Sequence, residues 1–500
     1  MSNKILFYID NWFFHFGIAK HLQKKLTADL YAIIDADEKS NKFFQTQKLI
    51  KFQKIWSISD PKLPINKSPD IEFLKSFEEQ FKINLWKIAY SDRVFYKFNP
   101  HYKFTHDEIL YMLEQKCRLY SEIFQNIHPN YFLTFLTVSY HHQLLYEICK
   151  AQKIKILMLQ PIKFGNRMTI SESSTKFDND VVTNKRKNLQ INSFEELNAY
   201  LKKFDVYLQD SKLLKDSFES RKIDRYKSNL SFFASFWDNE YQKRYWNYGR
   251  TRSKILAEKI SRSRKRKNIQ AFLDKHCLRN LDTLKPYVYY PLHYEPERIL
   301  LIDAPYYDDQ LTVIRNIAKS LPVGYFLAVK EHFMMKTLGW RDKSFYKNIM
   351  ELPNVKLIHP SVPPEKMIKN SALVITIAGT SGQEAAFYQK PTIVLTEQPY
   401  SQISSVTTLK HFEDLPNEIR NSLSKKVDIN EMTKFLETVE QNSFEINWRN
   451  LSNEFAFKFG FKGPVMAAEL NESNIEKFLD EHNSEFELLA NEHLKKLKQK

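Results

Sequence analysis

The sequence predicts an α/β protein with two doubly wound, Rossmann-like domains, a basic helical insertion between them and a helical C-terminal tail. Two observations lead to this prediction. Strand-like apolar runs alternate with helical patterns in two separate parts of the chain, and such runs are missing from the stretch between them. A length of 500 residues with 43% hydrophobic content suits a folded protein of two or three domains.

The first Rossmann-like domain is expected over residues 1–174. KILFYID and DLYAIID indicate strands at 4–10 and 29–35, and an amphipathic helix lies between them at 13–26. The same order recurs in NYFLTFL (130–136), HHQLLYEICKAQKI (141–154) and KILML (155–159). Repeated strand–helix–strand units of this kind build a parallel sheet.

The second Rossmann-like domain is expected over residues 286–427. Its patterns are a strand in PYVYYPLHYEP (286–296), a helix over 309–321, and strands in GYFLAVKEH (324–332) and VKLIHP (355–360). Residues 175–285 lack strand alternation and are rich in charged and aromatic residues, so they are expected to form the insertion. Residues 428–500 are expected to form the helical tail, in which the phenylalanines of FAFKFGFKGP (455–464) pack rather than bind a ligand.

A glycine turn in the second domain is the best candidate for a phosphate site. The chain has nine glycines, and Gly379 and Gly382 flank Thr380 and Ser381 within VITIAGTSGQEAAFYQKPTIVL (374–395). We expect a buried strand, a tight turn, a helix opened by a capping box from Ser381 to Glu384, and a second strand. Free N–H groups at such a helix start favour an anion, although a capped helix can also form there without a ligand.

Charge and cysteine content limit the classes of function. A net charge of +16 favours anionic partners such as nucleotides, acidic lipids or nucleic acid. The three cysteines are far apart, which indicates neither a disulfide framework nor a cysteine metal site and suits the cytosol. Neither a signal peptide nor a membrane-spanning run is expected, so any membrane contact would be peripheral, on the inner face.

Two nucleotide-binding folds in tandem are the layout of a GT-B glycosyltransferase or a sugar-nucleotide epimerase, with the ligand between the domains. Residues 286–400 in particular resemble the capsule polysaccharide biosynthesis family, whose better-known members are retaining Kdo transferases of GT-B fold. The matching segments are YYPLHYEPE, YYDDQLTVIRNIAKSLPVGYFLAVKEH, LPNVKLIHPS and the glycine-turn segment. The resemblance implies a nucleotide-activated sugar donor, such as a CMP-Kdo-like sugar, and a surface-glycan or lipid-linked acceptor. It also implies that residues 286–427 bind the nucleotide sugar and that residues 1–174 form the acceptor side.

The family's Lys-x-His-Pro motif has an imperfect counterpart here. Lys330 and His332 are present, but Phe333 stands where the proline belongs, and His359-Pro360 is an alternative place for the motif. His332 follows a strand, so its ring could stabilise charge that develops on the leaving phosphate, with Lys330 as the companion charge. A histidine satisfied in a loop and an ordinary edge-strand lysine are the structural alternatives.

Further candidates lie in the glycine turn and after the first strand of the second domain. Thr380 and Ser381 offer hydroxyl groups beside the N–H groups of the turn, and Glu384 either closes the capping box or binds ribose hydroxyls. His293 and Glu295 are expected to point the same way from an extended stretch into the site. The expected donor-binding residues are thus Lys330, His293, Gly379, Thr380, Ser381, Gly382 and Glu384.

Acid–base or nucleophilic work in sugar transfer needs a carboxylate. Asp10 and Asp35 end the first two strands, although strand-end carboxylates are also common helix caps. The expected catalytic residues are His332, Glu295 and Asp10. Asp35-Ala36-Asp37 and Asp178-Asn179-Asp180 spell D-x-D, a metal-binding pattern in other glycosyltransferases, but it is frequent by chance. We expect no required metal and no cofactor other than the nucleotide-sugar substrate.

The run RTRSKILAEKISRSRKRK (250–267) carries nine basic residues and one acidic residue, with a thin apolar stripe. It suits a solvated helix, an acidic membrane surface or nucleic acid, and without a nucleic-acid-binding motif we favour the membrane. The expected function is a metal-independent cytoplasmic glycosyltransferase of surface polysaccharide biosynthesis. The alternatives are a sugar-nucleotide epimerase or hydrolase of the same fold, and a basic nucleic-acid-binding protein.

Overall fold

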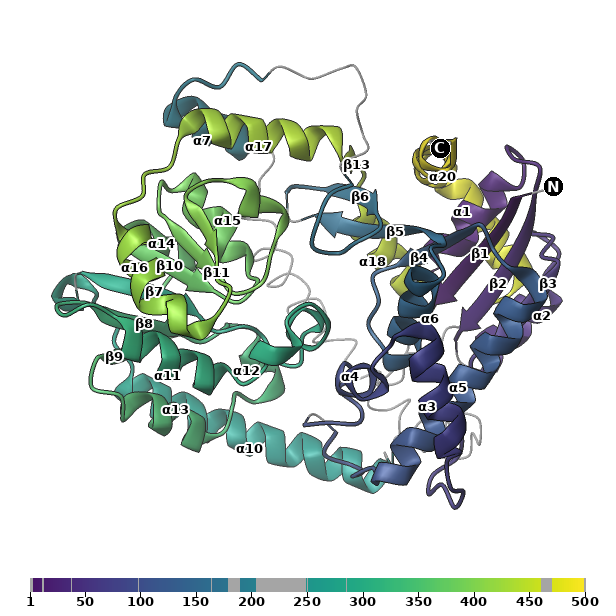
Figure 1. Cartoon of the computed structure of the whole chain (residues 1–500), viewed down its shortest axis with the longest axis horizontal. Helices are drawn as coiled ribbons and strands as arrows, with labels where there is room; N and C mark the ends of the chain where they lie inside the picture. The colour runs from purple at the N-terminus through teal and green to yellow at the C-terminus, as the bar shows by residue number, and fades with distance from the viewer. Residues whose placement is uncertain are drawn as a thin grey trace. The chain divides into compact units, whose positions relative to one another are not determined.

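The computed structural model describes residues 3–10, 13–36, 38–97, 99–162, 164–178, 189–203, 249, 251–284, 286–459 and 470–498. The chain divides into two compact units, and each is built around its own sheet (Figure 1). The first unit contains residues 1–174, 202–251 and 442–500, and the second contains 175–201 and 252–441. The expectation of two Rossmann-like α/β domains is confirmed.

The sheet of the first unit has seven strands in the order β13-β6-β5-β4-β1-β2-β3. They are β1 (Asn3–Asp10), β2 (Ala28–Asp35), β3 (Lys54–Ser57), β4 (Tyr131–Phe135), β5 (Lys155–Ile162), β6 (Arg167–Ser171) and β13 (Phe444–Glu445). β1 to β5 are parallel, whereas β6 and β13 join as antiparallel edge strands. The chain proceeds from β1 to β3 on one side and then returns to place β4 on the other side of β1. The switch point of this sheet therefore lies between β1 and β4.

Helices cover both faces of the first sheet because β1 is apolar on both sides. Ile5, Phe7 and Ile9 join one core, and the alternate residues Leu6 and Tyr8 join the other. The first core includes α1 (Phe14–Leu22), α2 (Glu38–Thr46), α18 (Trp448–Phe459), α19 (Glu472–Glu481) and α20 (Asn483–Lys498). The second includes α3 (Ile71–Phe81), α4 (Leu85–Tyr90), α5 (His106–Ile127) and α6 (Tyr140–Ala151).

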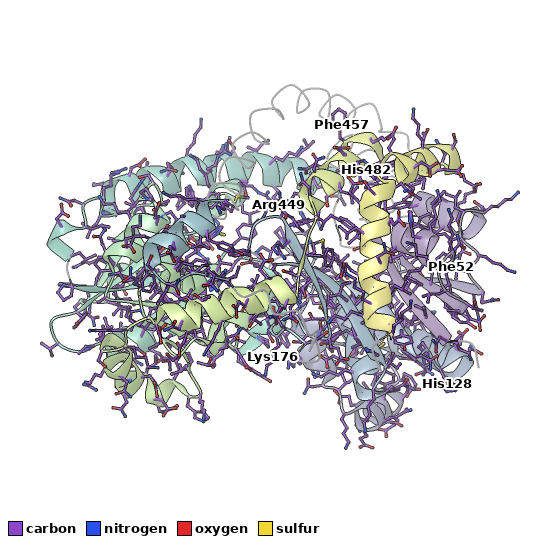
Figure 2. The ribbon with its side chains drawn as sticks, turned by 90° about the horizontal axis from the view of Figure 1, so that it is seen from above. Phe52, His128, Lys176, Arg449, Phe457 and His482 are labelled. Atoms are coloured by element: carbon purple, nitrogen blue, oxygen red, sulfur yellow. The ribbon has the colours of Figure 1, made fainter. Side chains whose placement is uncertain are left out.

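The expected C-terminal tail is helical, but it is divided between the two units. α17 (Ile429–Gln441) belongs to the second unit, and the helices after β13 pack on the first sheet. Phe455 and Phe459 are buried in that core as expected, whereas Phe457 is 86% exposed and points outward (Figure 2). Residues 460–469, which contain the rest of the phenylalanine-rich run, lie outside the described residues.

The sheet of the second unit has six parallel strands in the order β12-β11-β10-β7-β8-β9. They are β7 (Tyr287–Pro291), β8 (Phe326–Lys330), β9 (Val355–Ile358), β10 (Leu373–Thr376), β11 (Thr392–Val394) and β12 (Val406–Thr408). The chain runs outward from β7 to β9 and then returns to place β10 on the other side of β7. The switch point of this sheet therefore lies between β7 and β10.

Two layers of helices cover the second sheet. One core contains residues of α10 (Arg252–His276), α11 (Gln310–Ser320), α12 (Met335–Leu338), α13 (Lys343–Met350) and α16 (Leu415–Leu423). The opposite core contains residues of α14 (Pro364–Asn370) and α15 (Thr380–Phe387). α7 (Phe194–Lys203) lies beside α17, where Tyr200 donates a hydrogen bond to Glu440 over 2.9 Å (Figure 1).

The part of the expected insertion that is described as α10 is not a separate domain. Its C-terminal residues Ile269, Phe272 and Leu273 are buried in the core of the second sheet. These apolar positions recur at helical spacing just beyond the basic run, so the sheet domain holds one face of this part of the helix.

Candidate functional site

The candidate site lies at the carboxyl ends of β7 and β10. The two strands pair directly, with Val374 in register with Tyr289, so the loops that follow them start side by side. In doubly wound sheets, ligands bind at this edge next to the switch point. The loop after β7 carries His293 and Glu295, and the turn after β10 carries Gly379.

Gly379 allows the turn after β10 to approach the loop after β7. A Cβ atom added to Gly379 would lie 2.7 Å from Thr376 Oγ1, 3.1 Å from Ser381 Oγ and 3.2 Å from His293 Cε1. The backbone φ of Gly379 is −80°, which any residue can adopt. The glycine is therefore needed for close approach and not for an unusual backbone conformation.

The helix after this turn begins without a side-chain cap. α15 starts at Thr380 with Gly379 as its N-cap residue, and glycine has no side chain that could cap the first turn of the helix. The expected capping box is wrong, because Ser381 and Glu384 both lie inside the helix. An N-terminal turn without a capping side chain leaves N–H groups for an anion, so the phosphate interpretation of this turn does not depend on the capping box.

Gly382 serves packing in this structure. A Cβ atom at Gly382 would lie 2.7 Å from Tyr400 Oη and 2.8 Å from Tyr400 Cε2. The Tyr400 hydroxyl in turn donates a hydrogen bond to the carbonyl oxygen of Gly379. Burial and then the charge of Glu384 raise the pKa of Tyr400, which keeps this hydroxyl protonated as a donor. Gly382 thus lets Tyr400 fix the position of the turn.

His293 is held between the two strands. Its backbone N–H donates to Gln310 Oε1 over 2.8 Å, and its ring Nε2 lies 3.2 Å from Thr376 Oγ1. Thr376 Oγ1 also accepts a hydrogen bond from the N–H of Gly379 over 3.2 Å. The imidazole is thereby placed next to the glycine turn that opens α15.

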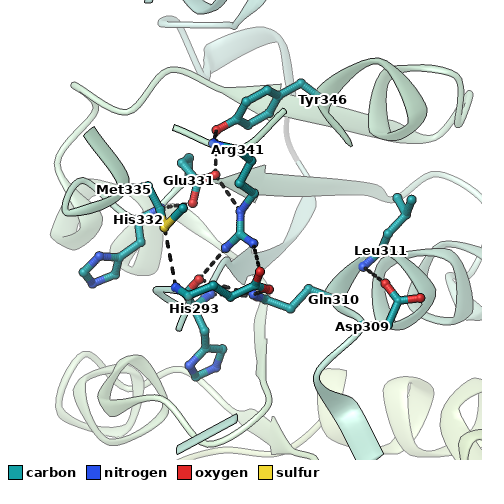
Figure 3. Close-up of polar contacts among 10 residues, drawn as sticks. His293, Asp309, Gln310, Leu311, Glu331, His332, Met335, Arg341 and Tyr346 are labelled. Carbon is teal, nitrogen blue, oxygen red and sulfur yellow. Dashed lines mark hydrogen bonds and ion pairs between the residues drawn. The ribbon is translucent and has the colours of Figure 1, made fainter. Parts of the chain in front are cut away.

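A buried ion cluster lies beside His293 and organises three loops (Figure 3). Arg341 donates from Nε to Glu331 Oε2 over 2.8 Å, and its Nη1 lies 2.7 Å from Glu295 Oε2. Its Nη2 donates to the carbonyl oxygen of His293 over 2.5 Å. One guanidinium therefore joins the loop after β7, the end of β8 and the segment before α13.

Further hydrogen bonds complete the cluster. Tyr346 donates to Glu331 Oε2 over 2.7 Å, and the backbone N–H of His332 donates to Glu331 Oε1 over 2.8 Å. Gln310 Nε2 donates to Glu295 Oε1 over 2.5 Å. Burial alone would lower the pKa of Arg341, but the charges of Glu331 and Glu295 outweigh it and raise that pKa. The guanidinium is therefore a permanent cation that compensates two buried carboxylates.

Lys330 is a second buried cation at this edge. It ends β8, which lies between β7 and β9, so the expected edge-strand explanation of this lysine is wrong. The residue is 3% exposed, and within the described residues no oxygen accepts a hydrogen bond from its Nζ. Burial lowers the pKa of Lys330 to about 8, with partial compensation from Glu331. In the described part of the chain, this buried ammonium thus has the nearby charge of Glu331 but no hydrogen-bonded oxygen of the kind that usually accompanies a buried charge.

The structure separates the two candidate histidines for the family motif. The His332 ring points away from the ion cluster (Figure 3). It packs on Phe333 and Tyr294, with ring-centroid distances of 5.0 and 6.0 Å. His359 lies at the end of β9, where Nδ1 is 2.5 Å from Ser361 Oγ and Nε2 is 2.9 Å from Asp274 Oδ1. Nδ1 of His359 thus contacts its own loop, and Nε2 connects β9 with α10.

The expectation that His293 and Glu295 point the same way is wrong. β7 ends at Pro291, so strand alternation does not reach Glu295. The His293 ring turns toward Thr376, whereas the Glu295 carboxylate enters the ion cluster.

The remaining expected residues are placed as follows. Thr380 and Ser381 open α15 at the site, and Glu384 lies within the same helix. Asp10 ends β1 in the first unit and is not part of this cluster. Asp37, Asn179 and Asp180 of the two D-x-D patterns lie outside the described residues. In the described part of the chain, no group of three or more histidine, cysteine, aspartate or glutamate residues could hold a metal ion.

Sequence reasoning missed the residues that organise the cluster, namely Glu331, Arg341, Gln310 and Tyr346. Glu331 carries a usable signal, because a charged residue that directly follows a buried strand lies at the ligand-binding edge. Arg341, Gln310 and Tyr346 come from helices or from the segments that flank them, and nothing in the sequence indicates that they meet.

Comparisons with known proteins give one family and several solved structures. Residues 191–437 match the family model described as "Capsule polysaccharide biosynthesis protein". No protein with a curated description matches the chain. A similar solved structure is UDP-GlcNAc 2-epimerase from Methanocaldococcus jannaschii, with 14% identity, a TM-score of 0.24, and coverage of 86% of this chain and 94% of that chain.

Two further solved structures are of KpsC from Thermosulfurimonas dismutans. The one described as a beta Kdo 2,4 transferase has 10% identity, a TM-score of 0.29, and coverage of 65% of this chain and 87% of that chain. The one described as a beta Kdo 2,7 transferase has 12% identity, a TM-score of 0.29, and coverage of 75% of this chain and 97% of that chain. Residues 191–437 contain the whole second sheet and its candidate site, so the match to the capsule polysaccharide biosynthesis family includes this site.

Proposed function

We propose that this protein is a glycosyltransferase of surface polysaccharide biosynthesis that moves a sugar from a nucleotide-activated donor to a glycan or lipid-linked acceptor. The match of residues 191–437 to the capsule polysaccharide biosynthesis family supports the polysaccharide pathway. The observation that carries the proposal is the close approach of Gly379 to His293 at the switch point of the second sheet. This approach places a helix start without a side-chain cap beside an imidazole at the edge where nucleotide folds bind phosphate.

The donor's phosphates would bind to the first turn of α15. The N–H groups of that turn and the hydroxyl groups of Thr380 and Ser381 are hydrogen-bond donors suited to phosphate oxygens. Lys330 supports this assignment, because a buried ammonium without a hydrogen-bonded oxygen gains most from an anionic ligand.

Sugar transfer breaks the bond between the anomeric carbon and a phosphate oxygen, and negative charge develops on that phosphate. Groups that stabilise this charge more strongly in the transition state than in the bound donor accelerate the step. We assign that role to Lys330 and His332, and we assign His293 to orienting the phosphate. Glu295 is already paired with Arg341 and Gln310, so its role is to position the loop that carries His293.

The same charges support transfer without a metal ion. Lys330 and the α15 N-terminus supply the positive charge that a divalent cation provides in other sugar transferases. We therefore expect the rate of transfer measured in the presence of EDTA to equal the rate measured with added Mg²⁺. A loss of activity in EDTA that Mg²⁺ restores would contradict metal independence.

The proposed place of action is the inner face of the membrane. Within the described residues, every helix is too short or too polar to cross a bilayer. α10 carries the exposed basic residues Arg264, Arg266 and Lys267, whereas Arg262 and Lys265 pair with Glu258 and Asp342. Arg264, Arg266 and Lys267 are close together in the sequence and suit attraction to anionic lipid headgroups near a lipid-linked acceptor.

A thermal-shift screen with CMP, CDP, UMP, UDP and GDP tests the donor site. A nucleotide that binds the native state raises the melting temperature, and the increase grows with the ratio of the nucleotide concentration to its Kd. The stabilising nucleotide then selects the sugar donors for an assay without acceptor. Stoichiometric conversion of a donor to its epimer under those conditions would replace the transferase assignment by a sugar-nucleotide epimerase.

A further inference from the structure

A second set of titratable side chains lies in the first unit, at the carboxyl ends of β1 and β2. Asp35 ends β2 and lies in register with Asp10 at the end of β1. Asp35 Oδ2 accepts a hydrogen bond from the Tyr8 hydroxyl over 2.7 Å and lies 3.0 Å from His141 Nε2. Three elements, β1, β2 and α6, therefore converge on one carboxylate oxygen.

The other oxygen of this carboxylate is not used. Within the described residues, Asp35 Oδ1 has no hydrogen-bond partner, and the side chain is 34% exposed. Tyr8 and His141 behind it are 1% and 5% exposed. The carboxylate thus has one oxygen fixed from inside and one oxygen facing outward.

His141 is fixed by the same contacts. Its Nε2 also lies 2.9 Å from Ser139 Oγ, while its buried Nδ1 has no partner within the described residues. Burial alone would lower the pKa of His141, but the charge of Asp35 outweighs it and raises that pKa. The pair therefore stabilises an imidazolium that faces a carboxylate.

Surrounding residues hold this pair in place. The Tyr8 ring stacks on His142 with a centroid distance of 3.7 Å, and His142 Nε2 lies 2.6 Å from Thr134 Oγ1 on β4. Lys116 of α5 pairs with Asp60 over 2.8 Å. The titratable and charged groups that surround the Asp35–His141 pair are Tyr8, Asp10, Asp60, Asp92, Lys116, Tyr120, Tyr140 and His142.

The position of the pair favours a ligand over a purely structural role. Here the open oxygen lies at the carboxyl ends of the parallel strands, next to the switch between β1 and β4, where such sheets bind ligands.

We propose that Asp35 binds a hydroxyl group of a neutral saccharide through Oδ1, and that Tyr8 and His141 are positioning residues for this carboxylate. The inference rests on the proposed function, since the saccharide would be the acceptor of the sugar. An ionised carboxylate held in one orientation accepts strong hydrogen bonds from sugar hydroxyls.

Asp35 binds this hydroxyl without removing its proton. Burial alone would raise the pKa of Asp35, but the charge and hydrogen bond of His141 outweigh it and hold that pKa well below its usual range. A carboxylate of such low basicity stays ionised but is a poor general base. Its contribution is therefore to the affinity and orientation of the acceptor.

Saturation-transfer difference NMR on the full chain tests this site. The probes are the methyl glycosides of glucose, galactose, N-acetylglucosamine and N-acetylgalactosamine at millimolar concentration. We expect at least one probe to bind the wild type and Asp35→Asn to weaken it about tenfold or more, as expected for loss of a hydrogen bond to a charged group. Asp29→Asn, at the opposite end of the same strand, is the matched control and retains wild-type binding.

The positioning residues need readouts that a general loss of stability would not change. Tyr8→Phe keeps the ring on His142 but removes the hydrogen bond to Asp35, and it should weaken the same probe when binding is measured well below the melting temperature of the variant. His141→Leu should weaken the probe, and His141→Gln should restore part of the affinity because its amide can donate to Asp35.

The outcomes separate this inference from the proposed function. Absence of any bound probe on the wild type overturns the saccharide site, as does equal binding to wild type and folded Asp35→Asn. Either result leaves the donor site intact if a nucleotide still stabilises the wild type in the thermal-shift screen. If the chain binds a methyl glycoside through Asp35 but binds no nucleotide, this result supports the saccharide site and contradicts the proposed function.

Discussion

Arg341 donates its Nε–H to Glu331 Oε2 over 2.8 Å, and both side chains are buried. The same guanidinium also compensates Glu295, so two carboxylates depend on one cation. This dependence makes Arg341 the residue whose loss should most disturb the geometry of the candidate donor site.

Arg341→Met should lower the free energy of unfolding by about 3–5 kcal/mol, because it leaves buried carboxylates without a counter-charge. Calorimetric melting of the variant and the wild type measures the loss. Arg420→Met removes an exposed arginine of the same unit, and it should change stability by less than about 1 kcal/mol. Equal melting temperatures for wild type and Arg341→Met would contradict the structural role of the cluster.

Nucleotide affinity should depend on pH through Lys330. Its pKa is lowered to about 8, so the ammonium is charged below that pH and neutral above it. An anion needs the charged form, and affinity should fall about tenfold between pH 7 and pH 9. Lys330→Met should bind more weakly at pH 7 and should lose this dependence. Titration calorimetry at both pH values that gives the same dependence for variant and wild type would rule out Lys330 as its source.

The first unit should lose stability in mild acid through His493. Burial lowers the pKa of this histidine from 6.5 to about 4, and neither its Nε2 nor that of the neighbouring His15 has a hydrogen-bond partner within the described residues. Between these pH values, His493 is therefore protonated in the unfolded chain but neutral in the folded chain. Stability should be complete above pH 6.5 and should fall by about 3 kcal/mol as the pH approaches 4.

His493→Leu tests this account of acid sensitivity. The substitution removes the titrating group from a fully buried position of α20, so its stability should change less between pH 6.5 and pH 4 than that of the wild type. Denaturant unfolding at a series of pH values measures both curves. Parallel curves for the two proteins would show that other groups cause the acid sensitivity.

Membrane attraction should depend on the exposed basic residues of α10. Replacing Arg264, Arg266 and Lys267 by Gln should reduce sedimentation with anionic liposomes, since each basic residue near such a surface contributes about 1 kcal/mol. Lys319, Lys347 and Lys366 are exposed elsewhere in the second unit, and their replacement by Gln is the control with the same change in charge. Equal loss of sedimentation for both sets would indicate a general effect of net charge.

The sequence was sufficient to predict the strands that build the site. Apolar runs with β-branched and aromatic residues located β1, β2, β7 and β8, because their burial on both faces leaves a recognisable pattern. The ligand-binding edge of the second sheet follows from these strands, and so does the importance of the turn at Gly379.

The rest of the fold and of the candidate site depends on contacts that leave no local pattern in the sequence. Arg341 meets Glu331 and Glu295 only because the chain returns past the end of β8 before α13. Likewise, the amphipathic helices α18 to α20 show that they bury one face, but their sequence does not say that this face packs on the first sheet. The predicted N-cap residue of α15 was also wrong. Ser381 fits a capping box in sequence, but the turn places Gly379 at the N-cap position.

The most direct test of the donor site is nucleotide binding to Gly379→Ala, measured by titration calorimetry with the nucleotide that most stabilises the wild type. The added methyl group would crowd Thr376 and the His293 ring, next to the turn at which we propose that the donor's phosphate binds. Gly324→Ala is the control for loss of a glycine, because its Cβ meets no atom within 4 Å and only its φ of +92° is strained. We predict that folded Gly379→Ala loses nucleotide binding while Gly324→Ala retains it, whereas unchanged affinity in Gly379→Ala would contradict a phosphate site at this turn.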